Sequence, residues 1–192
     1  MNTVEVIFSI FLGVGLASAS GFRVFLPLLV LSLAGYFDFI LLNESWIWVG
    51  SPASIVTLSA AALIEIFAYY IPWVDNILDS IALPLAGIAG TAVVLATVGD
   101  LNPIATWALA IIAGGGTAAA IKGSAASLRL TSTVASGGLA NPIVSTIETG
   151  SSLLMALVSI LLAPLAFILV IAILYVLYRF SKKLRKNKPP VI

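Results

Sequence analysis

The sequence predicts an all-α polytopic membrane protein with about six transmembrane helices, some of them broken or re-entrant. Of its 192 residues, 61% are hydrophobic and only 9% are charged, whereas a soluble domain has about 25% charged residues. Apolar segments of helical length recur along the chain, and no long polar stretch separates them. We therefore expect a single transmembrane domain over residues 1–180 and a basic cytoplasmic tail over residues 181–192.

In the first half, the positions of glycine and proline predict a broken segment over residues 4–36, followed by two long helices. Residues 4–19 are apolar, but Ser, Ala and Gly interrupt the run up to Gly21. Residues 24–36 are apolar as well, yet they are too short to cross a bilayer. Residues 4–36 therefore form either one broken helix or a helix followed by a re-entrant piece. Proline is typical of a first helical turn, so Pro52 predicts a helix over 52–71.

A polar connection and a short interfacial piece complete the first half. Residues 37–50 contain acidic side chains and tryptophans that suit a membrane–water interface. Pro72 ends the helix before it, and residues 73–79 form the interfacial piece. A further apolar helix then covers about residues 81–98.

The second half shows a similar order of features. A helix over 104–121 is interrupted at Gly123, and a short Ser-, Thr- and Ala-rich piece follows over 124–135. Asn141 and Pro142 then begin a helix that runs to about residue 162, and a final helix after Pro164 reaches Arg179.

This shared order predicts two inverted-topology repeats, over about 4–98 and 104–179. Each half has a helix break with a glycine, Gly21 or Gly123, beside a basic residue. With three crossings in each half, both termini lie on one side of the membrane. The basic tail predicts that this side is the cytoplasm.

Five ionisable residues within the apolar segments are the candidate substrate or ion pathway. A charge at the centre of a bilayer costs roughly 2.5 to 3.5 kcal/mol on insertion scales, so such residues face a partner, a cavity or a pathway. The candidates are Arg23, Glu65, Lys122, Arg129 and Glu148. Their partners among one another remain open at this stage.

Small and polar residues recur on the glutamate-bearing faces of the two proline-started helices. The polar stripe consists of Ser54, Thr57, Ser145 and Ser152. Such a stripe serves either helix packing or the lining of a site. Asp75 and Asp79, one turn apart, are either solvated acids at a helix end or a cation entrance.

The absence of cysteine and histidine removes most catalytic chemistry. A thiolate nucleophile, a thiolate metal site and a Ser-His-Asp triad are all excluded. We expect no metal, no cofactor and no enzymatic activity. We also expect no nucleic-acid partner, because a basic cluster beside a membrane helix is ordinarily an anchor attracted to anionic lipid. That cluster is Arg179, Lys182, Lys183, Arg185, Lys186 and Lys188.

Several motifs together resemble an uncharacterised bacterial family of integral membrane proteins, domain of unknown function 4126. The motifs are Gly21 to Leu29, Glu65 with Ile71 to Asp75 and Asp79, Pro84 to Gly87, Lys122 with Arg129, and Asn141 to Glu148. The chain departs from the family pattern at Ala68-Tyr69-Tyr70, where an acidic–basic pair is expected, and at Thr149, where a second acid is expected. The resemblance implies a multi-pass protein of the bacterial inner membrane, but no activity.

Two functions fit these features. The first is a small transporter or channel-like protein with a charged site near the midplane between the two halves. It would be proton-coupled and would carry a small ion or an anionic or amphipathic substrate. The second is a lipid-binding or scaffold protein whose buried charges only hold helices together. Membrane lipids are expected partners in both cases, and a homodimer is plausible at this chain length.

Overall fold

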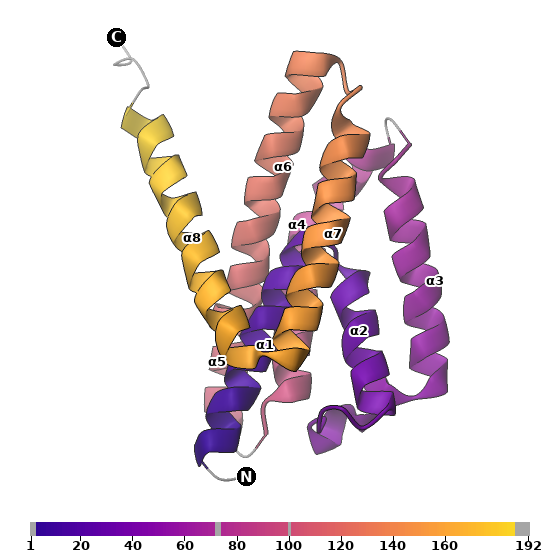
Figure 1. The fold of residues 1–192 in the computed structure, drawn as a ribbon, viewed down its shortest axis with the longest axis vertical. Helices are drawn as coiled ribbons and strands as arrows, with labels where there is room; N and C mark the ends of the chain where they lie inside the picture. Colours follow the sequence, from indigo (N-terminus) through magenta and orange to yellow (C-terminus); the bar gives the residue numbers. More distant parts are fainter. Residues whose placement is uncertain (1–2, 72–73, 100, 187–192) are drawn as a thin grey trace.

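The computed structural model describes residues 3–71, 74–99 and 101–186, and these residues contain helices and no strands (Figure 1). Pro72, Trp73, Asp100 and the last six residues of the predicted tail lie outside the described residues. In chain order the elements are α1 (Thr3–Phe22), α2 (Phe25–Tyr36), the 3-10 helix η1 (Glu44–Gly50), α3 (Pro52–Ala68), α4 (Val74–Thr97), α5 (Pro103–Leu109), the π-helix η2 (Ala110–Gly115), α6 (Gly116–Ser136), α7 (Asn141–Leu161) and α8 (Ala163–Lys186).

Within the described ranges, four helical segments are long and apolar enough to cross a membrane. They are Thr3–Phe22, Ile77–Thr97, Pro103–Ser136 and Asn141–Leu161. The count rises to five if η1 and α3, which meet at a bend of 63°, form one span. This composition identifies a membrane protein, while the six crossings and the inverted repeats remain predictions.

Helix α1 lies at the centre of the bundle and contacts α4, α6, α7 and α8. Every residue from Gly13 to Gly21 is buried, and almost all of them are small. Gly13, Gly15 and Gly21 sit where a side chain would overlap atoms of α4, α7 and α6 respectively. Small residues thus let three helices approach the backbone of α1 closely.

The chain reverses direction between α1 and α2. Gly50, before α3, lies against Gly35 near the end of α2, while Glu65 near the end of α3 reaches the start of α2. Helices α2 and α3 are therefore antiparallel, and the direction alternates along the rest of the chain (Figure 1). As a result α1 begins and α8 ends at opposite ends of the bundle. Both were expected on one side of the membrane, because residues 4–36 were predicted to make a single crossing.

The two predicted glycine breaks do not occur where they were placed. Helix α1 continues through Gly21, and the reversal follows two residues later at Arg23. Helix α6 runs unbroken through Lys122 and Gly123, so the predicted separate piece over 124–135 is wrong. A glycine within a helix costs only about 1 kcal/mol relative to alanine. Unlike proline, glycine also keeps the backbone N–H that the helical hydrogen bond needs. A glycine alone therefore does not end a helix.

The helix starts that were predicted from proline and asparagine are confirmed. Pro52 begins α3 behind a Ser51 side chain that accepts a hydrogen bond from the backbone N–H of Ser54 (3.2 Å). Asn141 and Pro142 begin α7, as predicted. By contrast, the predicted interfacial piece and the helix after it form one helix, α4, which contains Pro84 within it. Helix α8 likewise continues to Lys186, into the predicted tail.

Candidate functional site

The reversal at Arg23 creates the first element of the site. The N–H of Arg23 still bonds to the carbonyl of Ala19 (3.2 Å), but Val24 and Phe25 begin a new helix and have no preceding turn to bond to. Both oxygens of Glu65, from α3, accept these two N–H groups, at 2.8 Å from Val24 and 3.0 Å from Phe25. Glu65 therefore caps the N-terminus of α2 from another helix, where a negative charge is favoured.

The Arg23 side chain joins the break to α7. Its Nε donates to the hydroxyl of Thr149 (3.0 Å), and its Nη2 donates to the carbonyl (2.9 Å) and the hydroxyl (2.5 Å) of Ser145. The same Nη2 lies 3.9 Å from Oε2 of Glu148, as an ion pair. Arg23 is completely buried. Thr149, which replaces an acid expected in the family pattern, is thus a hydrogen-bond acceptor for Arg23.

Arg129 and Glu148 form the central ion pair. Nη2 of Arg129 donates to Oε2 of Glu148, and both side chains are buried. Nε of Arg129 also lies 3.3 Å from Oδ2 of Asp79 on α4. Arg129 therefore connects α6 to α7 and to α4.

Tyr69 lies at the centre of the cationic groups. Its ring centroid is 4.2 Å from Cζ of Arg23, 4.4 Å from Cζ of Arg129 and 4.9 Å from Nζ of Lys122. These distances suit cation–π contacts.

The phenol group of Tyr69 completes the network. It donates to Oδ1 of Asp79 (3.1 Å) and accepts from Nζ of Lys122 (3.1 Å). Lys122 lies 3.8 Å from the same Asp79 oxygen. Tyr69 was not among the predicted site residues; the available signal was its position within Ala68-Tyr69-Tyr70, where the resemblance implies an acidic–basic pair.

These contacts define what we call the cation cluster: Arg23, Lys122 and Arg129 around Tyr69, with Asp79 and Glu148 as its carboxylates. Four polar atoms of the cluster are buried and have no hydrogen-bond partner among the described residues: Nη1 of Arg23, Nε and Nη1 of Arg129, and Oε1 of Glu148. In the same part of the chain, no group of three or more acidic side chains could hold a metal ion. The arrangement suits the binding of an anion rather than a cation.

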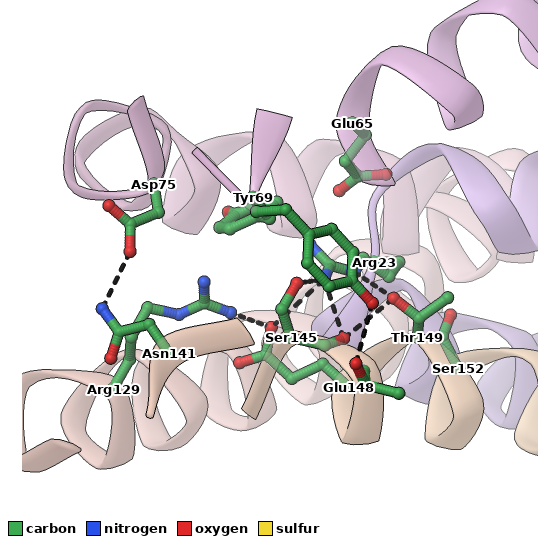
Figure 2. Close-up of polar contacts among 12 residues, drawn as sticks. Arg23, Glu65, Tyr69, Asp75, Arg129, Asn141, Ser145, Glu148, Thr149 and Ser152 are labelled. Atoms are coloured by element: carbon green, nitrogen blue, oxygen red, sulfur yellow. Dashed lines mark hydrogen bonds and ion pairs between the residues drawn. The ribbon is translucent and has the colours of Figure 1, made fainter. Parts of the chain in front are cut away.

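Asp75 and Asn141 form a second polar contact beside the cluster. Nδ2 of Asn141 donates to Oδ2 of Asp75 (2.8 Å) and also to the hydroxyl of Thr133 (3.0 Å). Asp75 is buried, so it is not a solvated acid at a helix end. The contact ties the start of α4 to the start of α7 (Figure 2).

Only half of the predicted polar stripe reaches the site. Ser145 contacts Arg23, and Ser152 donates to the carbonyl of Ala19 (3.0 Å). Ser54 and Thr57 instead bond to the carbonyls of Trp48 and Ala53 near the start of α3. That end of α3 lies beside η1, whereas only its other end approaches the break at Arg23.

Two mainly apolar pockets flank the site. One, of about 260 Å³, lies between α3 and α4 and is lined in part by Glu65 and Tyr69. The other, of about 400 Å³, lies between α6, α7 and α8 and includes Glu148 in its lining. Each of the two pockets thus borders one buried carboxylate, Glu65 or Glu148.

Comparison with known proteins decides the family. Residues 10–183 match the family described as Domain of unknown function (DUF4126). The chain belongs to the DUF4126 family. Neither the curated proteins nor the solved structures include a significant match. For this DUF4126 protein, the function must therefore be inferred from the site.

Proposed function

We propose that this DUF4126 protein is a small membrane transporter for anionic solutes, and that the cation cluster is its binding site. The observation that carries the proposal is that two buried guanidinium groups keep donors that no protein acceptor uses. In the part of the chain that the structure describes, ion pairs join the buried cations Arg23, Lys122 and Arg129 to Asp79 and Glu148. Each arginine also keeps a buried terminal nitrogen without an acceptor. Because such donors are costly to leave unpaired, an anion that supplies acceptors is bound favourably.

Glu148 is the group best placed to exchange with a substrate. One of its oxygens bonds to Arg129, while the other has no partner among the described residues. Protonation of Glu148 removes its negative charge from Arg129, which then needs another anion. Binding of a proton and binding of an anion are thereby coupled, as in intramembrane proton relays.

Flux in proteoliposomes tests this proposal. Vesicles containing the full chain and a pH-sensitive dye receive gradients of chloride, phosphate or methanesulfonate. We expect at least one anion to drive proton flux above that of protein-free vesicles. Glu148→Gln should reduce this flux to the protein-free level, because glutamine does not carry the proton. Glu44→Gln, an exposed acid on η1, is the matched control and should retain full flux.

A scaffold role is the second candidate, and a specific observation favours it. Glu65 bonds to two backbone N–H groups, and Arg23 bonds to Ser145 and Thr149, so both have protein partners. A scaffold gives no anion-dependent flux in the wild type, and a Glu148→Gln protein with unchanged flux would also contradict the transport proposal.

We further propose that the end of the bundle containing the end of α8 faces the cytoplasm. Exposed basic residues, Arg179 and Lys182, lie at that end of α8. The connections at the opposite end, residues 37–43 and 98–102, carry acids and no lysine or arginine. The positive-inside rule then places the start of α1 outside, which revises the expectation that both termini are cytoplasmic.

Cysteine labelling tests the orientation directly, because the natural chain has no cysteine. Phe39 and Leu139 are highly exposed and lie in connections at opposite ends of the bundle. In intact cells, we expect a membrane-impermeant maleimide to label Phe39→Cys but not Leu139→Cys. Permeabilised cells should show labelling of both. The reverse pattern in intact cells would overturn the orientation.

A further inference from the structure

We propose that the pocket between α6, α7 and α8 binds the alkyl chain of a long-chain fatty acid, whose carboxylate replaces Glu148 at Arg129. This inference rests on the proposed function and names the substrate class of the same site. It also assigns the route: the substrate enters sideways from the bilayer, between α7 and α8, rather than from water.

The pocket has the shape and surface for a single alkyl chain. Its volume is about 400 Å³, and its lining includes Ala125 and Leu128 of α6, Ile147 of α7, and Ile173 and Leu177 of α8. In Figure 1, α8 diverges from α6 and α7 towards its C-terminal end. Leu128 is 58% exposed and Ile147 is 62% exposed. An apolar chain in the bilayer can therefore reach the pocket laterally.

The polar end of the pocket supplies the head-group site. Glu148 is the charged residue in its lining, and it is hydrogen-bonded to Arg129. The Arg129–Glu148 pair uses one nitrogen and one oxygen, while Nη1 of Arg129 and Oε1 of Glu148 remain unpaired within the described ranges. A planar carboxylate that approaches the guanidinium can form both bonds of a bidentate pair. The head group that best replaces Glu148 is therefore another carboxylate.

Two other pockets formed by described residues fit this role less well. The pocket of about 630 Å³ between α4, η2 and α6 has no charged residue in its lining, so it cannot select a head group. The pocket of about 260 Å³ beside Glu65 is smaller, and both oxygens of Glu65 are bonded to the backbone of α2. Of these three pockets, the one at Glu148 combines an apolar lining with a carboxylate that can be exchanged for a ligand.

Binding of a fluorescent fatty acid tests the inference. The probe carries a dansyl group at the far end of its chain, and the full-length protein is held in nanodiscs of phosphatidylcholine. We expect saturable binding by the wild type. Ala125→Phe fills the pocket and should weaken binding about tenfold or more, which corresponds to about 1.4 kcal/mol. Leu177→Trp fills it from α8 and should act in the same direction.

The matched control is Ala119→Phe. Ala119 lies on the same helix, α6, but lines the pocket beside α4, so its variant should bind the probe as the wild type does.

A probe with the same chain and a trimethylammonium head should bind much more weakly. Equal binding of that probe, stronger binding of a single-chain lipid with a phosphate head, or full binding by both pocket-filling variants would overturn the inference.

The outcomes also separate this inference from the proposed function. If Glu148→Gln abolishes flux of small anions but the wild type does not bind the fatty acid, transport stands and the substrate class is wrong. If the fatty acid binds in the pocket but neither it nor a small anion drives proton flux, the binding site stands and transport is wrong.

Discussion

Replacement of Arg129 alone by methionine is expected to destabilise the protein by about 3 to 5 kcal/mol, because it leaves a buried carboxylate without its partner. Arg129 and Glu148 are 1% and 4% exposed, so water cannot take over the lost interaction. Asp79 also loses its ion pair with Nε of Arg129. The free energy of unfolding can be measured by titration with sodium dodecyl sulfate in mixed micelles, followed by circular dichroism.

The double variant Arg129→Met, Glu148→Met should recover part of this loss, although Asp79 still lacks its pair with Arg129 and Arg23 loses its pair with Glu148. A buried ion pair that is replaced as a whole by apolar side chains often costs little, since its desolvation penalty disappears with it. Arg179→Met, at an exposed position on α8, should change the stability little. Additive losses in the double variant would show that the Arg129–Glu148 pair is not the interaction that matters at these positions.

The five pathway candidates could be predicted as buried groups from the sequence, because the cost of a charge in a bilayer limits where it can lie. All five are buried, and Arg23, Lys122, Arg129 and Glu148 belong to one cluster. The starts of α3 and α7 were also predictable, since proline fits a first helical turn. These features depend on the residue type and its immediate sequence, so they can be predicted without knowledge of the tertiary contacts.

The partners could not be predicted, because they depend on which helices meet. Glu65 was expected to face a base or a pathway, but the reversal at Arg23 leaves two N–H groups that it accepts instead. Tyr69 had no signal in its own type or spacing, because its role arises from three cations on other elements.

Asp79 shows how a wrong helix boundary changes the interpretation of a residue. The prediction ended an interfacial piece at Asp79, which made the residue a solvated acid or an entrance. In the structure α4 begins at Val74, so Asp79 lies in its second turn and faces Lys122 and Arg129. Asp79 belongs to the cation cluster, and Asp75 contacts Asn141 beside it. The entrance role of both residues stays a prediction.

Replacement of Glu65 by alanine is expected to be the second severe change, because it leaves the N–H groups of Val24 and Phe25 buried without acceptors. Each such group costs about 1 to 3 kcal/mol. Glutamine keeps one side-chain carbonyl oxygen, so Glu65→Gln should retain part of the cap and lose less stability than Glu65→Ala. The two values are measured by the same detergent titration, and hydrogen exchange at Val24 and Phe25 reports the cap itself.

The ranking of these variants distinguishes a cap from an ion pair. If Glu65 acted mainly through its charge on Arg23, glutamine would be as harmful as alanine, since neither carries a charge. If it acts as the cap of α2, Glu65→Gln lies between the wild type and Glu65→Ala, and exchange at Val24 and Phe25 follows the same order. Glu44→Ala, at an exposed acid on η1, should leave both the stability and the exchange unchanged. The structure favours the cap, because both oxygens of Glu65 are already bonded to backbone N–H groups.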